Sequence, residues 1–153
     1  MRIAVLDIGG TSIKSGLWNG QELVDVREQD TEAKKGAAHV VSRILEILKT
    51  YRPFDGVGIS TAGQVNSEEG YIRYANENIP GYTGTRLKDI VASEFGTPVA
   101  VENDVNAAAL GEAAWGAGKD HDDFLCLTYG TGVGGAIIIG KKIYSGSMFS
   151  AGE

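Results

Sequence analysis

The chain has 153 residues, of which 42% are hydrophobic and 22% are charged, and this is the composition of one ordinary globular domain. Its 20 acidic and 14 basic residues give a net charge of -6 without any large basic cluster, which argues against a nucleic-acid partner. No apolar run approaches the roughly 18 residues of a membrane-spanning helix. The single cysteine, Cys126, offers no disulfide and is expected to be a buried core thiol. The sequence therefore predicts a cytoplasmic protein without a membrane partner.

The first 50 residues predict three strands followed by a helix. An apolar run at residues 3–6 and an alternating pattern at residues 14–18 indicate two strands. Asn19-Gly20 is a strong hairpin signal and leads into a third strand over residues 23–28. Apolar residues at helical spacing then predict a helix over residues 37–49.

The middle of the chain predicts a buried strand over residues 56–61, followed by a hairpin and a long loop over residues 64–85. Thr85 is expected to cap a helix that ends at Gly96, and a strand at residues 99–101 follows it.

Two glycine-rich turns each follow an apolar strand. The first is Asp7-Ile8-Gly9-Gly10-Thr11, and the second, Gly130-Thr131-Gly132, follows residues 124–127. We expect Gly9 and Gly10 to adopt φ values that other residues avoid, so that their N–H groups form a concave patch for phosphate oxygens. Neither turn runs into a helix, so neither is a Walker loop or a dinucleotide fingerprint. An ordinary hairpin is the alternative for the first turn, but its second copy favours two cradles around the phosphates of a nucleotide.

Side chains around the first turn suit a nucleotide site. Asp7 is a hard oxygen ligand of the kind that Mg²⁺ takes, usually through water. Thr11 adds a hydroxyl group. Lys14 either screens phosphate charge or lies on an exposed hairpin face.

Asn103 and Asp104 separate the strand at residues 99–101 from an alanine-rich helix predicted over residues 105–115. As a plain N-cap, Asp104 would stabilise this helix by about 0.5–2 kcal/mol and need no further role. An amide beside a carboxylate also offers a hydrogen-bonding group and a base at the end of a strand, where ligands of α/β sheets usually bind. The helix dipole would keep Asp104 ionised near neutral pH. Both interpretations stay open at this point.

Neither histidine is expected in a site. His39 has no partner in the sequence and is interpreted as a surface residue, and His121 lies in a polar connector at residues 120–123, where solvent is its expected neighbour.

These motifs, together and in this order, resemble those of the ROK family of bacterial sugar kinases and related repressors. Residues 7–11 and 130–135 are similar to the two phosphate motifs of that family. Asn103-Asp104 matches its sugar-binding Asn and catalytic Asp. Asn78-Ile79-Pro80-Gly81-Tyr82 resembles a loop that lines the sugar pocket, and Ala151-Gly152-Glu153 the start of a segment whose Glu contacts sugar hydroxyls.

The resemblance implies an α/β fold of the actin-like ATPase (ribonuclease H-like) class. Residues 1–118 would form the N-terminal lobe with a mixed sheet, and residues 119–153 the crossover and opening hairpin of an incomplete second lobe. It also implies an ATP-dependent sugar kinase that transfers the γ-phosphoryl group to a hexose-type hydroxyl. The roles it implies are phosphate binding for Gly9, Gly10, Thr11, Lys14, Gly130, Thr131 and Gly132; Mg²⁺ binding through water for Asp7; sugar binding for Asn78, Asn103 and Glu153; and proton acceptance for Asp104.

Family members extend well beyond residue 153 and carry their zinc site, adenine pocket and closing helix there. We therefore expect the 153-residue chain alone to have little or no kinase activity, and the full-length protein to be a homo-oligomer. The strand pair in residues 124–144 should leave an apolar face uncovered. A sugar-responsive repressor core is disfavoured, because only Met1 and Arg2 precede the first strand, where such relatives carry a helix-turn-helix. A non-catalytic sugar- or nucleotide-binding module is the other alternative.

Overall fold

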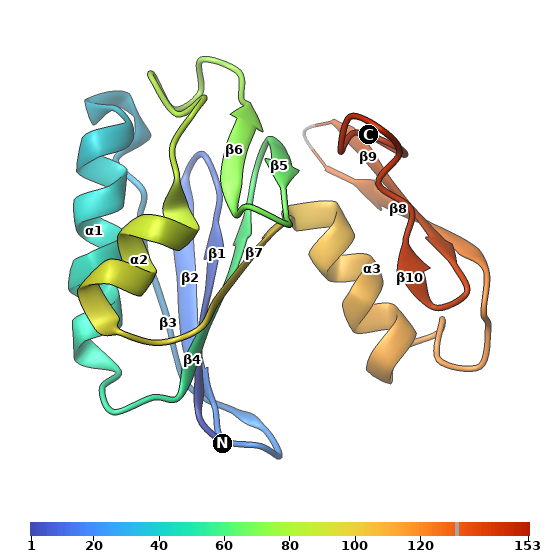
Figure 1. Ribbon diagram of the computed structural model, residues 1–153, viewed down its shortest axis with the longest axis horizontal. Coiled ribbons are helices and arrows are strands. Elements are labelled where there is room, and N and C mark those ends of the chain that lie inside the picture. The colour runs from blue at the N-terminus through green and yellow to red at the C-terminus, as the bar shows by residue number, and fades with distance from the viewer. Residues whose placement is uncertain (131) are drawn as a thin grey trace. The chain divides into compact units, whose positions relative to one another are not determined.

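The computed structural model describes residues 1–130 and 132–153, which form two compact units, Met1–Glu102 and Asn103–Glu153 (Figure 1). Each unit has its own hydrophobic core. The lobe boundary expected near residue 118 concerns the complete family fold and stays a prediction.

A five-stranded mixed sheet in the order β3-β2-β1-β4-β7 forms the first unit. The first three strands form an antiparallel meander, and β4 pairs in parallel with β1. These strands are β1 Ile3–Ile8, β2 Ser12–Trp18, β3 Leu23–Asp30, β4 Gly56–Thr61 and β7 Val99–Asn103, whose last residue belongs to the second unit. The strands predicted from apolar runs and from alternation at residues 14–18 are therefore confirmed.

Two helices, α1 Ala37–Thr50 and α2 Leu87–Phe95, cover one face of this sheet (Figure 1). Side chains alternate between the faces of a strand, so Ala4, Leu6 and Ile8 of β1 are buried on the helix side. Asp7 therefore projects from the opposite face. A 3-10 turn at Ala33–Lys35 precedes α1, and a small hairpin of β5 Gln64–Asn66 and β6 Tyr71–Tyr74 precedes α2.

The ends of α2 test two predictions. Gly96 closes the helix in the left-handed conformation with φ 64°, which confirms the predicted stop. The prediction that Thr85 caps the helix is wrong, because the N-cap position is Arg86 and it makes no side-chain capping hydrogen bond.

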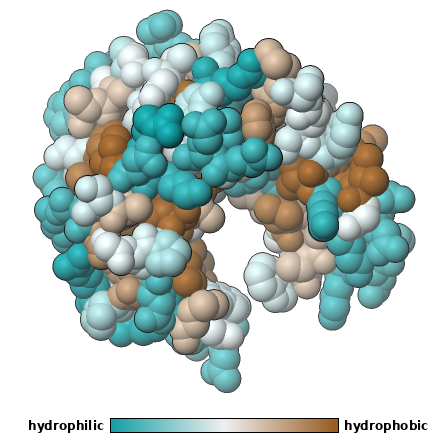
Figure 2. All heavy atoms as spheres, viewed as in Figure 1, coloured by the Kyte–Doolittle hydropathy of each residue, from teal (hydrophilic) through white to brown (hydrophobic). Residues whose placement is uncertain are grey.

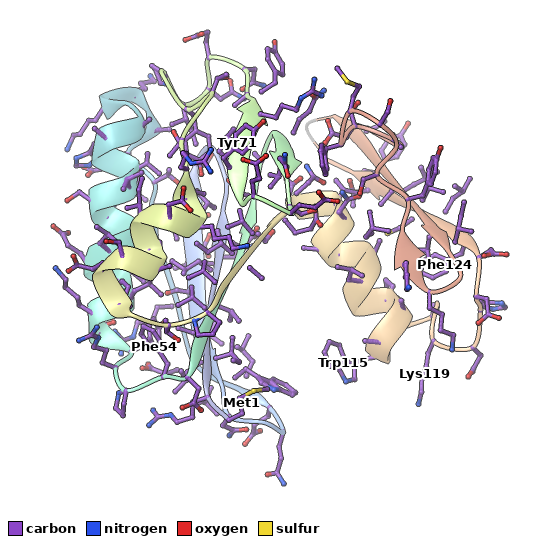
Figure 3. All side chains as sticks on the ribbon, viewed as in Figure 1. Met1, Phe54, Tyr71, Trp115, Lys119 and Phe124 are labelled. Carbon is purple, nitrogen blue, oxygen red and sulfur yellow. The ribbon has the colours of Figure 1, made fainter. Side chains whose placement is uncertain are left out.

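The second unit packs α3, Asp104–Trp115, against a three-stranded antiparallel sheet in the order β10-β9-β8. Its strands are β8 Phe124–Tyr129, β9 Val133–Ile139 and β10 Lys142–Ile143. Ala109 of α3 meets Ala136 and Ile138 of β9 in a small core. Figure 3 shows Trp115 at the end of α3, where its side chain is 77% exposed.

Strand β8 has an uncovered apolar face, as expected. Leu125, Leu127 and Tyr129 are 69%, 70% and 92% exposed, and Figure 2 shows hydrophobic residues on the visible surface of this unit. Cys126 points the other way and packs against the small core, but it is only half-buried, so the expected fully buried thiol is not observed. Among the described residues, no helix is long and apolar enough to span a membrane.

Candidate functional site

The first glycine turn joins β1 to β2. The Gly9 N–H donates to the Ser12 carbonyl oxygen at 2.9 Å and closes the turn. Neither Gly9 nor Gly10 has a positive φ, so the predicted unusual backbone conformation is wrong. Close approach explains Gly9 instead: a Cβ there would lie 3.2 Å from the Ser12 carbonyl oxygen. A Cβ on Gly10 would make only an ordinary 3.8 Å contact with the Cβ of Asn78.

The outer side of this turn presents hydrogen-bond donors. Gly10 and Thr11 are exposed, and within the described part of the chain their N–H groups make no hydrogen bond. Adjacent backbone N–H groups without partners form the kind of concavity that binds anions. The turn can therefore bind phosphate oxygens through its backbone.

Asp7, Lys14 and Ser60 occupy neighbouring strands at the same level. Asp7 lies opposite Lys14 on β2 and opposite Ser60 on β4. The Ser60 hydroxyl donates to Asp7 Oδ1 at 2.9 Å and orients the exposed carboxylate. Lys14 is exposed and also lies opposite Glu28 on β3, so it stands between two carboxylates. Ser60 was not foreseen, because its pairing with Asp7 depends on the parallel register of β1 and β4.

Asp7 suits a magnesium ion bound through water. No group of three potential metal ligands occurs among the residues that the structure describes. Mg²⁺ keeps several water ligands and is usually held by one or two carboxylates together with substrate phosphates. An exposed carboxylate at the base of a turn that can bind phosphate oxygens fits that donor set.

Asn78 lies beside the first glycine turn, in the loop between β6 and α2. A short turn holds Asn78 within this loop, and Tyr82 anchors the loop after it. The Asn78 N–H donates to Asn76 Oδ1 at 3.1 Å, and the Tyr82 hydroxyl lies 3.0 Å from Thr61 Oγ1 in the core. Burial raises the pKa of Tyr82 to about 12, so this anchor stays neutral. Two motifs far apart in the sequence thus meet in the first unit.

The start of α3 assigns separate roles to Asn103 and Asp104. The side-chain oxygen of Asn103 accepts from the N–H groups of Val105 at 2.9 Å and Asn106 at 3.0 Å. Asn103 is therefore the N-cap, and the interpretation of Asp104 as the cap is wrong. Asp104 is the first helical residue and is exposed, and its Oδ1 accepts from Asn103 Nδ2 at 3.0 Å and from the Val105 N–H at 2.9 Å.

The second glycine hairpin joins β8 to β9. The Gly130 N–H donates to the Gly132 carbonyl oxygen at 2.9 Å, and a Cβ on either residue would meet open space. Thr131, the third predicted residue of this motif, lies outside the described residues. Gly134 and Gly135 instead allow close packing of β9 against neighbouring segments. A Cβ on Gly134 would overlap Val105 of α3, and a Cβ on Gly135 would overlap the Gly152 carbonyl oxygen.

Small residues on β9 thus bring three predicted motifs together within the second unit: the second glycine-rich motif, Asn103-Asp104 and the segment that ends at Glu153. Gly134 places the strand against the first turn of α3, next to Asp104. Gly135 places it against the final turn, where the Glu153 N–H donates to the Ser150 carbonyl oxygen at 3.3 Å.

An ion cluster surrounds Glu32, just before α1. Its carboxylate bonds Lys35 Nζ at 2.7 Å and His39 Nε2 at 2.6 Å, and Arg43 Nη1 lies 3.3 Å away. His39 lies partly at the surface, with 32% of its side chain exposed, but it has a partner in Glu32 that the sequence did not indicate. The hydrogen bond from Lys35, followed by that from His39, lowers the pKa of Glu32 to about 2. The i,i+3 spacing of Glu32 and Lys35 is the one feature of the sequence that indicates part of this cluster, namely their ion pair.

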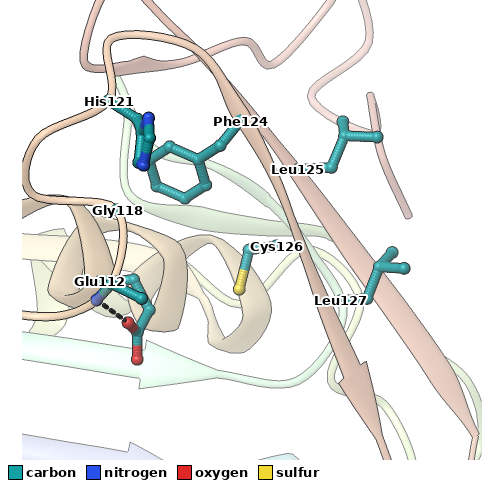
Figure 4. Close-up of a pocket in the computed structure, with 8 residues that line it drawn as sticks. Glu112, Gly118, His121, Phe124, Leu125, Cys126 and Leu127 are labelled. Carbon is teal, nitrogen blue, oxygen red and sulfur yellow. Dashed lines mark hydrogen bonds between the residues drawn. The ribbon is translucent and has the colours of Figure 1, made fainter.

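A pocket of about 400 Å³ lies in the second unit, and none of the predicted site residues lines it (Figure 4). Its walls are mainly apolar, and Glu112 accepts a hydrogen bond from the Ala117 N–H at its edge. His121 is exposed at this pocket, as predicted. The residues that line it are Glu112, Ala117, Gly118, His121, Phe124, Leu125, Cys126 and Leu127.

Comparison with known proteins identifies relatives across the whole chain. The model of the ROK family matches residues 3–153. An uncharacterized protein of Clostridium perfringens is 49% identical over 154 residues, covering 98% of this chain and 52% of the relative. The β-glucoside kinase of Listeria monocytogenes is 37% identical over 155 residues, covering 100% of this chain and 52% of that enzyme.

A solved structure confirms the expected actin-like α/β class. The ROK family glucokinase of Streptomyces griseus, in complex with glucose and AMPPNP, matches with a TM-score of 0.88 and 37% identity, covering 100% of this chain and 49% of that one. This chain therefore spans about half the length of the curated relatives it matches.

Proposed function

The chain belongs to the ROK family, and on this premise we propose that the full-length protein is an ATP-dependent sugar kinase acting on a hexose-type hydroxyl. The observation that carries the proposal is the first glycine turn, where the exposed N–H groups of Gly10 and Thr11 follow the strand that bears Asp7. The Listeria relative named as a β-glucoside kinase and the glucokinase structure with glucose and AMPPNP support the same reaction class.

Phosphoryl transfer requires positioning and charge stabilisation more than covalent chemistry from the protein. In this proposal the N–H groups of Gly10 and Thr11 bind phosphate oxygens of ATP, and Lys14 adds a nearby positive charge. The second hairpin, Gly130, Thr131 and Gly132, binds phosphate from its own unit. Asp7 would hold Mg²⁺ through water, and this ion would supply charge neutralisation at the phosphates.

Asp104 is the proposed general base. Its carboxylate is exposed at the start of α3, and hydrogen bonds from the Asn103 amide and the Val105 N–H fix its orientation. A positioned base accepts the proton of the attacking hydroxyl as the bond to phosphorus forms. Asn78, Asn103 and Glu153 are the proposed sugar ligands, since their polar side chains can pair with hydroxyl groups.

The decisive experiment measures ADP release by the full-length protein with ATP, magnesium and a panel of sugars. We expect turnover with at least one hexose-type sugar. Asp104→Asn keeps an acceptor oxygen at the start of α3, so it should fold and bind AMPPNP while losing about 10²- to 10⁴-fold in rate. An unchanged rate would remove Asp104 from the mechanism.

The same panel distinguishes the alternatives. Sugar binding without ADP release from any sugar would contradict the kinase proposal and favour a repressor core or a non-catalytic binding module. The 153-residue chain is expected to release little or no ADP, and a normal kinase rate from it would refute that expectation.

A further inference from the structure

Thr31 is a buried polar residue that no sequence motif singled out. It directly follows β3 and is fully buried, with 0% of its surface exposed. The register pairs Ser12 with Asp30, so Thr31 comes opposite Thr11, at the edge of the first glycine turn.

Both hydrogen-bond donors of Thr31, the backbone N–H and the hydroxyl, donate to that turn. Its N–H donates to the Thr11 carbonyl oxygen at 2.9 Å, and its hydroxyl donates to the Gly9 carbonyl oxygen at 2.7 Å. The Ser12 carbonyl oxygen accepts from Gly9 within the turn. Three carbonyl groups of the turn are thereby held in internal hydrogen bonds.

The orientation of these carbonyls matters because a peptide unit carries its N–H and C=O in opposite directions. The peptide that bears the Gly9 carbonyl also bears the Gly10 N–H. A hydrogen bond that holds the Gly9 carbonyl toward Thr31 therefore aims the Gly10 N–H away from it, toward solvent. If the peptide rotated, a carbonyl oxygen would face the ligand and repel an anion.

We propose that Thr31 is a positioning residue that holds the Gly9–Gly10 peptide in its phosphate-binding orientation. This inference rests on the proposed function, because it assigns Thr31 a part in binding the phosphates of the nucleotide. Thr31 itself touches no ligand and acts through the turn.

The residues that follow Thr31 are held by hydrogen bonds and an ion pair. The next residue, Glu32, is in the left-handed conformation with φ 52°, and its carboxylate bonds Lys35 at 2.7 Å. The Ala37 N–H then donates to the Pro80 carbonyl oxygen at 2.9 Å, in the loop that carries Asn78. The segment thus connects the glycine turn with the proposed sugar loop. A binding site keeps its geometry when hydrogen bonds from neighbouring residues hold its groups in place.

The test compares Thr31→Val with the wild type in the full-length protein. Valine has nearly the same shape but lacks the hydroxyl donor. Thr97→Val is the matched control, because the Thr97 hydroxyl also donates to a backbone carbonyl, that of Asp55 at 2.6 Å, at the opposite end of β4 from the turn. Binding of AMPPNP and of adenosine is measured by calorimetry, since only AMPPNP carries phosphates.

We expect Thr31→Val to raise the Kd for AMPPNP about tenfold, equivalent to about 1.4 kcal/mol, and to leave the Kd for adenosine unchanged. Thr31→Ser restores the donor and should restore AMPPNP binding, and Thr97→Val should bind both ligands like the wild type. If Thr31→Val does not fold, Thr31→Ser and Thr31→Ala differ only in the hydroxyl, and their ratio of AMPPNP affinities replaces the comparison.

Two results would overturn the inference while leaving the kinase proposal intact. They are an unchanged AMPPNP affinity in Thr31→Val, and an equal loss for adenosine, which would indicate a general structural role. Failure of the wild-type protein to bind AMPPNP would instead refute the proposed function, and the phosphate role of Thr31 with it.

Discussion

Asn103 combines a structural role that the structure shows with a sugar-binding role that we propose, and two substitutions separate them. Its side-chain oxygen accepts the N–H groups of Val105 and Asn106, whereas its amide group donates to Asp104. Asn103→Ala removes both the acceptor and the donor. Asn103→Asp keeps the acceptor oxygen, removes the amide donor and adds a negative charge.

The expected stabilities follow from the helix cap. Replacing an N-cap by alanine costs about 0.5–2 kcal/mol. A loss of about 1 kcal/mol lowers Tm by about 2–4 °C in a protein of 150–250 residues, and by less in a longer protein. Aspartate at position 103 still accepts both N–H groups, and a negative charge near a helix N-terminus contributes about 0.3–1 kcal/mol. Repulsion from Asp104 opposes this gain. Asn103→Asp should therefore melt close to the wild type, and Asn103→Ala should melt lower.

Sugar affinity should follow a different order. An amide can donate to and accept from sugar hydroxyls, whereas a carboxylate only accepts. We expect both variants to lose about tenfold or more in affinity for the preferred sugar, which is about 1.4 kcal/mol. Thermal melts and calorimetric titration of the full-length protein measure the two effects. A large loss of stability in Asn103→Asp would refute the capping argument, and wild-type sugar binding by that variant would refute the ligand role.

Two further predictions concern the first unit. Gly10→Ala should leave Tm unchanged, because its Cβ would make only an ordinary contact with Asn78, but it should weaken AMPPNP binding about tenfold by crowding the phosphate; equal affinities in a titration would contradict the backbone cradle. The second prediction concerns Glu32, whose pKa is lowered from 4.5 to about 2 by its hydrogen bonds with Lys35 and His39. These interactions stabilise the fold fully above pH 4.5, and this stabilisation is lost as the pH falls toward 2. Thermal melts between pH 7 and acid should show Glu32→Gln melting below the wild type at neutral pH, with the gap narrowing below pH 4.5, and a gap independent of pH would show that charge is not its cause.

Local patterns in the sequence were sufficient to predict the strands and hairpins of the first unit. The apolar run at residues 3–6 locates β1, the alternation at residues 14–18 indicates β2, and Asn19-Gly20 predicts the hairpin that leads into β3. The position of the first glycine turn follows from the same pattern. Its backbone conformation does not, because glycine can serve either a positive φ or a close approach, and here a Ser12 carbonyl oxygen near Gly9 is the reason.

The first residue of a helix was harder to predict, because it depends on the backbone conformation of a single residue, the N-cap. Asn103 and Asp104 are both good N-caps, and only the extended φ and ψ of Asn103 decide between them. Two contacts join residues of different elements, that of Glu32 with His39 and that of Asp7 with Ser60. His39 meets Glu32 after an intervening 3-10 turn, and Ser60 meets Asp7 through strand pairing 53 residues away. Spacing rules for a single helix or strand contain no information on such pairs.

The charges of the chain explain why backbone groups carry the proposed phosphate site. The net charge of -6 repels an anion, and Lys14 stands in register between the carboxylates of Asp7 and Glu28. These two carboxylates also repel an anion, which offsets part of its attraction to Lys14. The N–H groups of Gly10 and Thr11 keep their dipoles whatever the pH, and only rotation of the peptides can redirect them. For this reason the sensitive positions of the site should be Gly10, on the turn, and Thr31, buried beneath it.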